Sequence, residues 1–118
     1  MSRKGNSDVK RLRLDGGTIQ NWDDFHDQCT DRFGFPDFYG RNMDAWIDCL
    51  TSLDAPDDGM TTIHVEPGEV LVLEIDNARE LKQSCPDVFA AIVECAAFVN
   101  DRRVKRERPA VIALSFHA

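Results

Sequence analysis

A chain of 118 residues can form one domain around a single hydrophobic core and is too short for two. Hydrophobic residues make up 42% and charged residues 30%, a balance that excludes disorder as the default interpretation. No apolar run approaches the roughly 20 residues that span a bilayer, and no apolar segment follows the charged start MSRKGNSDVK. We therefore expect neither an anchor nor a signal peptide, and a cytoplasmic location.

The net charge of −7 conceals an uneven distribution. Residues 14–101 hold 19 acidic and 4 basic side chains, a balance of 4 − 19 = −15, whereas ten of the fourteen Lys and Arg lie outside this segment. Such a surface repels nucleic acid and attracts a cationic partner. The common alternative is that the acidity only keeps the protein in solution.

The first half of the chain predicts one strand and two helices. Residues 9–14, VKRLRL, alternate apolar and basic side chains as a strand does, and DGG ends the run. Residues 22–33, WDDFHDQCTDRF, repeat apolar side chains at helical spacing and are followed by Gly34. Asn42 can cap a second helix that continues to about residue 53. The expected apolar stripe of that helix is Met43, Ile47 and Leu50, with Trp46 and Leu53 on its flank.

The second half begins with a long loop at residues 54–69, in which a short hairpin fits around residues 61–65. Residues 70–75, VLVLEI, form a near-continuous apolar run, typical of a central strand covered on both faces. A short helical turn at 77–82, a basic solvated connection at 101–108 and a closing strand at 109–116 complete this half. Between them, Asp87 can cap a helix at 88–100 whose expected buried face is Val88, Ala91, Ile92, Cys95, Phe98 and Val99.

Strands that alternate with helices favour parallel pairing. The sequence thus predicts an α/β fold, a three-stranded parallel sheet with helices packed on it, over residues 9–118, preceded by a flexible N-terminus at residues 1–8.

Catalytic and metal-binding motifs have no clear match in the sequence. It contains no GxSxG, P-loop, GxGxxG or HExxH pattern, and its four cysteines form no CxxC pair, so we expect them to be reduced, partly buried thiols. Asp44 and Asp48, at i and i+4, could share a divalent ion with Glu94, which leaves a small carboxylate enzyme as one alternative.

The same two aspartates suit an ordinary solvated helix face equally well. Against this, like charges at this spacing repel, and Arg41 is the one nearby base in the sequence that could relieve Asp44. The adjacent aromatics Phe38 and Tyr39, just ahead of the acidic helix, are typical of exposed binding anchors.

Residues 35–51, FPDFYGRNMDAWIDCLT, resemble the defining segment of the barstar family, the intracellular inhibitors of barnase-type secreted ribonucleases. In that family an aromatic-Tyr-Gly-x-Asn-x-Asp-Ala stretch enters the inhibitory helix, and a second Asp follows one turn later. The expected order of elements over residues 9–116 is similar to the family's as well. The resemblance implies a barstar-like fold with no catalytic residues, metal or cofactor. It also implies a protein that binds neither membrane nor nucleic acid directly and is monomeric when free.

The partner that the resemblance implies is a basic secreted or toxin ribonuclease. Asp48 would take the place of a substrate phosphate in the active site of that enzyme, Asp44 would pair with a base at its rim, and Phe38 would pack on its catalytic histidine. The further partner contacts implied by the resemblance are Tyr39, Gly40, Asn42, Ala45, Thr51 and Glu94.

The chain also departs from the family pattern. Phe38 stands in the position of a tyrosine, Ile47 in that of an exposed tryptophan, and Ser52-Leu53 in that of a Gly-Trp pair. A barstar-like adaptor for a basic partner that is not a nuclease is therefore a second alternative. For the inhibitor hypothesis we expect Asp44 and Asp48 to be exposed and free of basic partners within their own chain.

Overall fold

The computed structural model describes residues 10–118. The expected flexible segment at residues 1–8, and Val9 of the expected first strand, lie outside the described residues. The elements, in chain order, are β1 (Arg11–Asp15), the 3₁₀-helix η1 (Gly16–Thr18), α1 (Trp22–Phe33), α2 (Met43–Thr51), the 3₁₀-helix η2 (Pro56–Asp58), β2 (Leu71–Asp76), α3 (Ala78–Ser84), α4 (Pro86–Lys105) and β3 (Ile112–Phe116).

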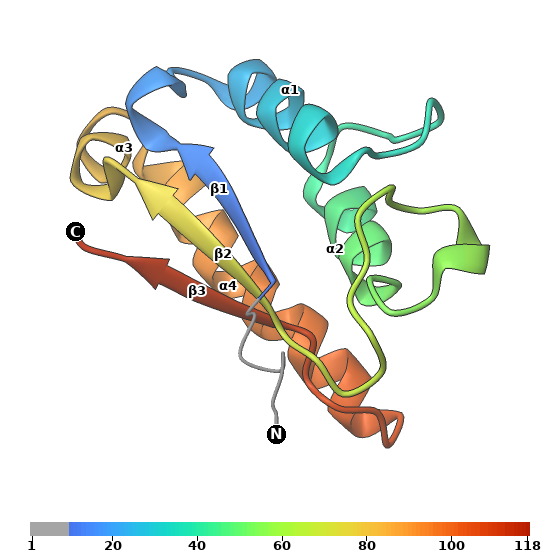
Figure 1. Cartoon of the computed structure of the whole chain (residues 1–118). Coiled ribbons are helices and arrows are strands. Elements are labelled where there is room, and N and C mark those ends of the chain that lie inside the picture. Colours follow the sequence, from blue (N-terminus) through green and yellow to red (C-terminus); the bar gives the residue numbers. More distant parts are fainter. Residues whose placement is uncertain (1–9) are drawn as a thin grey trace.

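The three strands form one parallel sheet in the order β1-β2-β3, which confirms the predicted fold class (Figure 1). Leu12 of β1 lies opposite Leu73 of β2, and Leu71 of β2 lies opposite Ile112 of β3. Because parallel strands need a crossover, α1 and α2 connect β1 to β2, and α3 and α4 connect β2 to β3.

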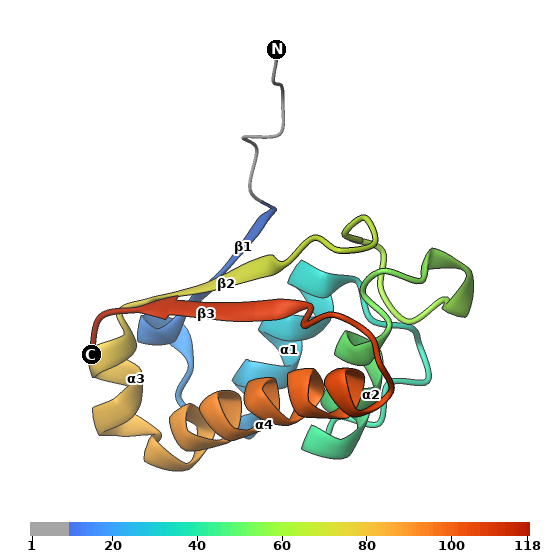
Figure 2. The ribbon, with the colours of Figure 1, turned by 90° about the horizontal axis from the view of Figure 1, so that it is seen from below.

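The helices lie together on one face of the sheet, as Figure 2 shows with the sheet seen edge-on. The prediction that β2 is covered on both faces is therefore wrong. Its side chains alternate instead, with Leu71, Leu73 and Ile75 buried and the residues between them partly exposed. On the open face, Glu74 forms ion pairs with Arg11 and Arg13 of the neighbouring strand.

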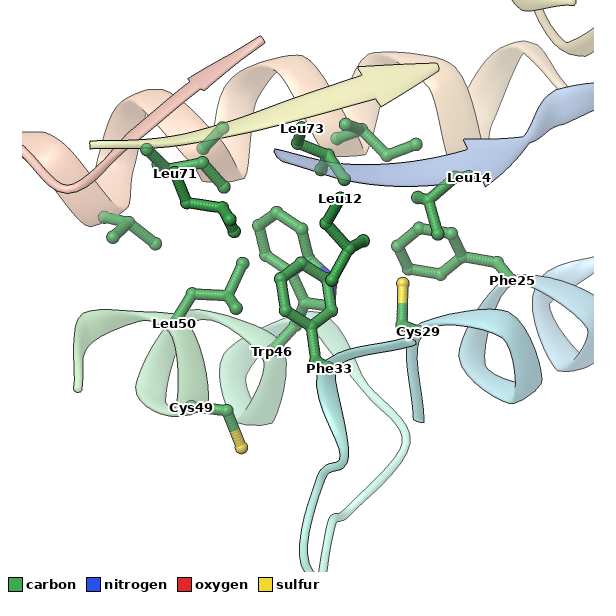
Figure 3. Packing of buried hydrophobic residues seen from close by; sticks show 14 of the residues in the cluster. Leu12, Leu14, Phe25, Cys29, Phe33, Trp46, Cys49, Leu50, Leu71 and Leu73 are labelled. Atoms are coloured by element: carbon green, nitrogen blue, oxygen red, sulfur yellow. The ribbon is translucent and has the colours of Figure 1, made fainter. Parts of the chain in front are cut away.

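The core fills the space between the sheet and the helices (Figure 3). Leu12 and Leu14 point from β1 toward Phe25 and Phe33 of α1, and Trp46 of α2 completes this layer with no exposed surface. Trp46 and Leu53, expected at the flank of the helix, are fully buried, whereas Met43 is only partly buried. The buried stripe of α2 is thus rotated toward Trp46 relative to the prediction.

Local signals account for both boundaries of α1. Asn21 caps α1 by accepting the Asp24 N–H, and Gly34 ends the helix in the left-handed conformation at φ 67°. The helix α4 departs from the prediction at both ends. It starts at Pro86 without a side-chain cap from Asp87, and it continues to Lys105, through the segment predicted to be a solvated connection.

The loop between α2 and β2 contains the 3₁₀-helix η2 and no strand at residues 61–65, so the suggested hairpin does not form.

The four cysteines are free thiols, Cys29 and Cys49 buried and Cys85 and Cys95 partly buried. Among the described residues, no helix combines the length and the apolar character that crossing a membrane requires.

Candidate partner-binding site

Two aspartates lie on the side of α2 that faces away from the core. The backbone N–H of Ala45 donates to Oδ1 of Asn42 over 2.8 Å, so Asn42 caps the helix as predicted. Trp46 anchors the opposite side of the helix in the core. Asp44 and Asp48 are exposed, one turn apart, and no basic side chain within residues 10–118 lies within 4.0 Å of Asp44.

Asp48 does have a basic partner in its own chain. Nη1 of Arg102, on α4, donates to Oδ1 of Asp48 over 2.8 Å, and the two side chains retain 26% and 57% of their exposure. The expectation that both aspartates are uncompensated is therefore wrong for Asp48. It failed because α4 was expected to end at residue 100, whereas its extra turn brings Arg102 beside α2.

Arg41, the base expected to relieve Asp44, points elsewhere. Its Nη2 lies 3.0 Å from Oδ1 of Asp27 and 3.4 Å from Oδ1 of Asp23, and it donates to the Asp23 carbonyl oxygen over 3.2 Å. Arg41 also adopts a φ of 54°, which is uncommon for a residue with a side chain. These contacts fasten the segment before α2 to α1 and leave Asp44 without that base.

The two aromatics ahead of α2 have opposite environments. Phe38 is 74% exposed, as a binding anchor requires. Tyr39 is buried, with its hydroxyl 2.7 Å from Nδ1 of His26 and its ring centroid 4.4 Å from that of Phe35, so the expectation of an exposed Tyr39 is wrong. Burial, followed by the charge of Arg41, lowers the pKa of His26, so a neutral imidazole is favoured beside the tyrosine hydroxyl.

Helix α4 supplies the second side of the site, and Figure 2 shows it passing beside α2. Burial raises the pKa of the Cys95 thiol, and the carboxylates of Glu94 and Asp44 raise it further. Asp44 on α2 and Glu94 on α4 are both exposed, and these two helices pack against each other.

Phe98 belongs to this surface, although its place in the apolar pattern predicted a buried side chain. It is 48% exposed, and the guanidinium carbon of Arg102 lies 5.4 Å from the centre of its ring. Glu94, Phe98 and Arg102 are spaced at i, i+4 and i+8 and so follow one stripe of α4. That spacing was available in the sequence, but the helix was expected to end before Arg102.

The remaining predicted contacts differ in what they can offer. Gly40 is exposed, and its carbonyl oxygen accepts from the Asn42 side chain over 3.3 Å. Ala45 is partly buried. The Thr51 hydroxyl is already used within the helix, where it donates to the Ile47 carbonyl oxygen over 2.6 Å.

The positions at which the family carries aromatic rim residues face inward here. Ile47 is 4% exposed and Leu53 is fully buried, so neither can contribute a rim contact. Phe38 and Phe98 are the large apolar side chains that remain exposed in the loop before α2 and on the α4 stripe. Phe38 stands at a contact position that the resemblance implies, whereas Phe98 on α4 is not among the implied contacts.

A buried ion pair connects the segment that follows α2 to α4. Arg103 is 1% exposed and donates from Nη1 and Nη2 to the two carboxylate oxygens of Asp54 over 3.0 and 2.7 Å. The same guanidinium donates to the carbonyl oxygens of Thr51 and Pro109, each over 2.8 Å. Consecutive arginines thus serve different purposes, Arg103 inside the fold and Arg102 at the surface.

The carboxylate enzyme needs Asp44, Asp48 and Glu94 to share a metal ion. Within residues 10–118, no three His, Cys, Asp or Glu side chains are grouped so that they could hold one.

Two comparisons relate the chain to known proteins. A family model described as Barstar (barnase inhibitor) matches residues 9–115, a range that includes every residue of the candidate site. The chain is also similar to a Bacillus subtilis (strain 168) protein named "Putative ribonuclease inhibitor YrdF", with 43% identity over 49 residues. That alignment covers 41% of the chain and 54% of the relative, so the chain spans about half the length of the curated relative that it matches.

Proposed function

The chain belongs to the barstar family, and we propose that it inhibits a barnase-type, guanyl-preferring microbial ribonuclease by blocking its active site. The observation that carries the proposal is the exposed acidic face of α2, where Asp44 has no basic partner among the described residues. A phosphate-binding active site is lined by donors and cations, and carboxylates are suitable ligands for both.

In the proposed complex, Asp48 takes the place of a substrate phosphate, while Asp44 and Glu94 meet basic side chains around it. Phe38, exposed at 74%, packs against the catalytic histidine of the nuclease and excludes water from the charged contacts. The surplus of acidic over basic side chains in residues 14–101 attracts a basic nuclease from a distance and speeds the encounter.

This function requires no reaction by the chain itself, so we propose that it is not an enzyme. The inhibitor acts as a monomer in the cytoplasm, where it protects the producing cell from its own secreted ribonuclease or from a delivered toxin nuclease. Its partner is a basic protein, and it makes no direct contact with nucleic acid or membrane.

The test is the inhibition constant of Asp48→Ala against a barnase-type ribonuclease. A central charged contact of this kind costs about 2 kcal/mol or more when truncated, which corresponds to at least about thirtyfold weaker inhibition. Asp87→Ala is the control, because Asp87 is an exposed aspartate like Asp48 but lies at the start of α4, far along that helix from Arg102, the partner of Asp48. Asp87→Ala removes the same charge outside the candidate site and should inhibit as the wild type does.

Circular dichroism and thermal unfolding must show that both variants retain the fold. Equal inhibition by Asp48→Ala and Asp87→Ala would contradict the proposed role of Asp48. A wild-type protein that inhibits no such ribonuclease, yet captures another basic protein through Asp48, would support the adaptor alternative. The inward-facing Ile47 and Leu53 make that comparison necessary, because they remove rim contacts that the family pattern implies.

A further inference from the structure

Asp48, the side chain proposed to replace a phosphate, already has a cation beside it. Arg102 approaches it to 2.8 Å from the last turns of α4. On the premise that the chain inhibits a nuclease, we infer that Arg102 determines partner specificity: it competes with the partner's cation for Asp48, and the partner binds by exchange of this ion pair.

The exposure of the pair permits such an exchange. Asp48 retains 57% of its side-chain exposure, so a second cation can approach the carboxylate from solvent. Two cations at one carboxylate repel each other, and the arriving group must therefore displace Arg102 or share it with an acidic group of its own. Ion pairs between exposed side chains are weak, so the existing pair does not prevent the exchange.

Phe98 provides a place for the displaced guanidinium. The Arg102 guanidinium carbon lies 5.4 Å from the centre of the Phe98 ring, and this cation–π contact does not depend on the hydrogen bond to Asp48. Asp101, the neighbouring acid on the same helix, is paired with Lys105 over 2.9 Å. The released charge of Arg102 therefore remains at the surface, facing the partner.

The resulting surface has mixed polarity. Asp44 and Glu94 have no basic partner within residues 10–118 and favour cations, whereas Arg102 favours an acidic group between or beside them. A partner with bases opposite the two acids and one carboxylate opposite Arg102 satisfies every charge. A uniformly basic partner leaves Arg102 facing like charge, so Arg102 selects against it.

The test compares Arg102→Gln with Arg106→Gln. Both variants remove one positive charge near the C-terminal end of α4, where Arg106 directly follows the helix, and Arg106 is exposed with no ion pair among the described residues. Isothermal titration gives the dissociation constant of each variant for a short oligoarginine peptide, which is uniformly basic. We expect Arg102→Gln to bind the peptide roughly two- to fivefold more tightly than Arg106→Gln, the range that corresponds to one exposed ion pair.

The same comparison in an Asp48→Asn background shows whether Arg102 acts through Asp48. The difference between the two glutamine variants should disappear there, because the ion pair is already absent. Equal peptide affinities in the wild-type background, or a difference that persists with Asp48→Asn, would overturn the inference.

A barnase-type ribonuclease serves as the second probe. We expect its preference over the peptide, taken as the ratio of the two dissociation constants, to fall at least about twofold in Arg102→Gln relative to Arg106→Gln. An unchanged or larger preference would refute the role in specificity. Failure of the wild type to inhibit the ribonuclease would instead refute the proposed function, while the peptide measurements would still decide whether Arg102 competes for Asp48.

Discussion

Asp54→Asn is expected to destabilise the fold strongly, because it leaves the Arg103 guanidinium buried without its counter-charge. The Arg103 side chain is 2% exposed and that of Asp54 is 11% exposed. Their two hydrogen bonds, of 2.7 and 3.0 Å, form the bidentate geometry that an amide cannot reproduce. The pair joins the segment after α2 to α4, so its loss should weaken the packing between the two helices that carry the candidate site.

The magnitude follows from the burial of the pair. Removing one partner of a buried ion pair costs about 3 to 5 kcal/mol, because the remaining charge is desolvated and unpaired. Arg103 keeps its hydrogen bonds to the carbonyl oxygens of Thr51 and Pro109. We therefore expect the lower end of that range, about 3 kcal/mol, in the free energy of unfolding at pH 7.

Urea unfolding of the variant, the wild type and Asp101→Asn measures this difference. Asp101 pairs with Lys105 at an exposed i,i+4 position of the same helix, and its loss should cost about 0.3 to 0.5 kcal/mol. A loss below about 1 kcal/mol for Asp54→Asn would refute the reasoning, since such a value is typical of an exposed pair.

The pH dependence provides a second check. Hydrogen bonds from Arg103 hold the pKa of the Asp54 carboxyl below its ordinary value despite partial burial. A depressed carboxyl pKa contributes stability above the unfolded-state value, near 4, and this contribution is lost as the pH falls through the folded-state value. The difference between the wild type and Asp54→Asn should thus shrink in acid, and a constant difference would contradict the assignment.

Two further predictions concern the core and the turn after α1. Gly34→Ala should unfold at a lower urea concentration than Gly59→Ala. Both glycines have positive φ, but an added Cβ at Gly34 would clash with Oγ1 of Thr62, whereas one at Gly59 would meet nothing within 4 Å. Equal midpoints would show that the turn yields without cost. Burial raises the pKa of Cys29 to about 12 and that of Cys49 to about 11, so Ellman's reagent at pH 8 should modify neither thiol in the native protein and both after unfolding. Rapid native modification of either thiol would refute its placement in the core.

The elements that the sequence predicted well have boundaries set by neighbouring residues. Helix α1 spans Trp22–Phe33, the range predicted, because Gly34 adopts the left-handed conformation that ends a helix. Asn42 caps α2 through a hydrogen bond to a residue three positions away. Such signals act within about one helical turn, so they can be recognised from the sequence alone.

The errors concern contacts between distant residues. The segment 101–108 is rich in charge and was assigned to a solvated connection, yet α4 continues to Lys105 and buries Arg103. Its carboxylate partner, Asp54, is 49 positions away. The covering of β2 on one face rather than two likewise depends on where the helices pack, and no local pattern in an apolar run specifies that.

The sequence by itself determined that two aspartates follow a capped helix start and share one helix face, because the 3.6-residue period requires it. Tertiary structure alone decided which neighbours they have. Phe38 is exposed and Tyr39 is buried because α1 supplies His26 as the hydrogen-bond partner of the tyrosine, and Asp48 is paired because α4 brings Arg102 from 54 positions away. The sequence alone gives the charges of the side chains on a helix face. Whether those charges are paired depends on which distant side chains the packing of the helices places beside them.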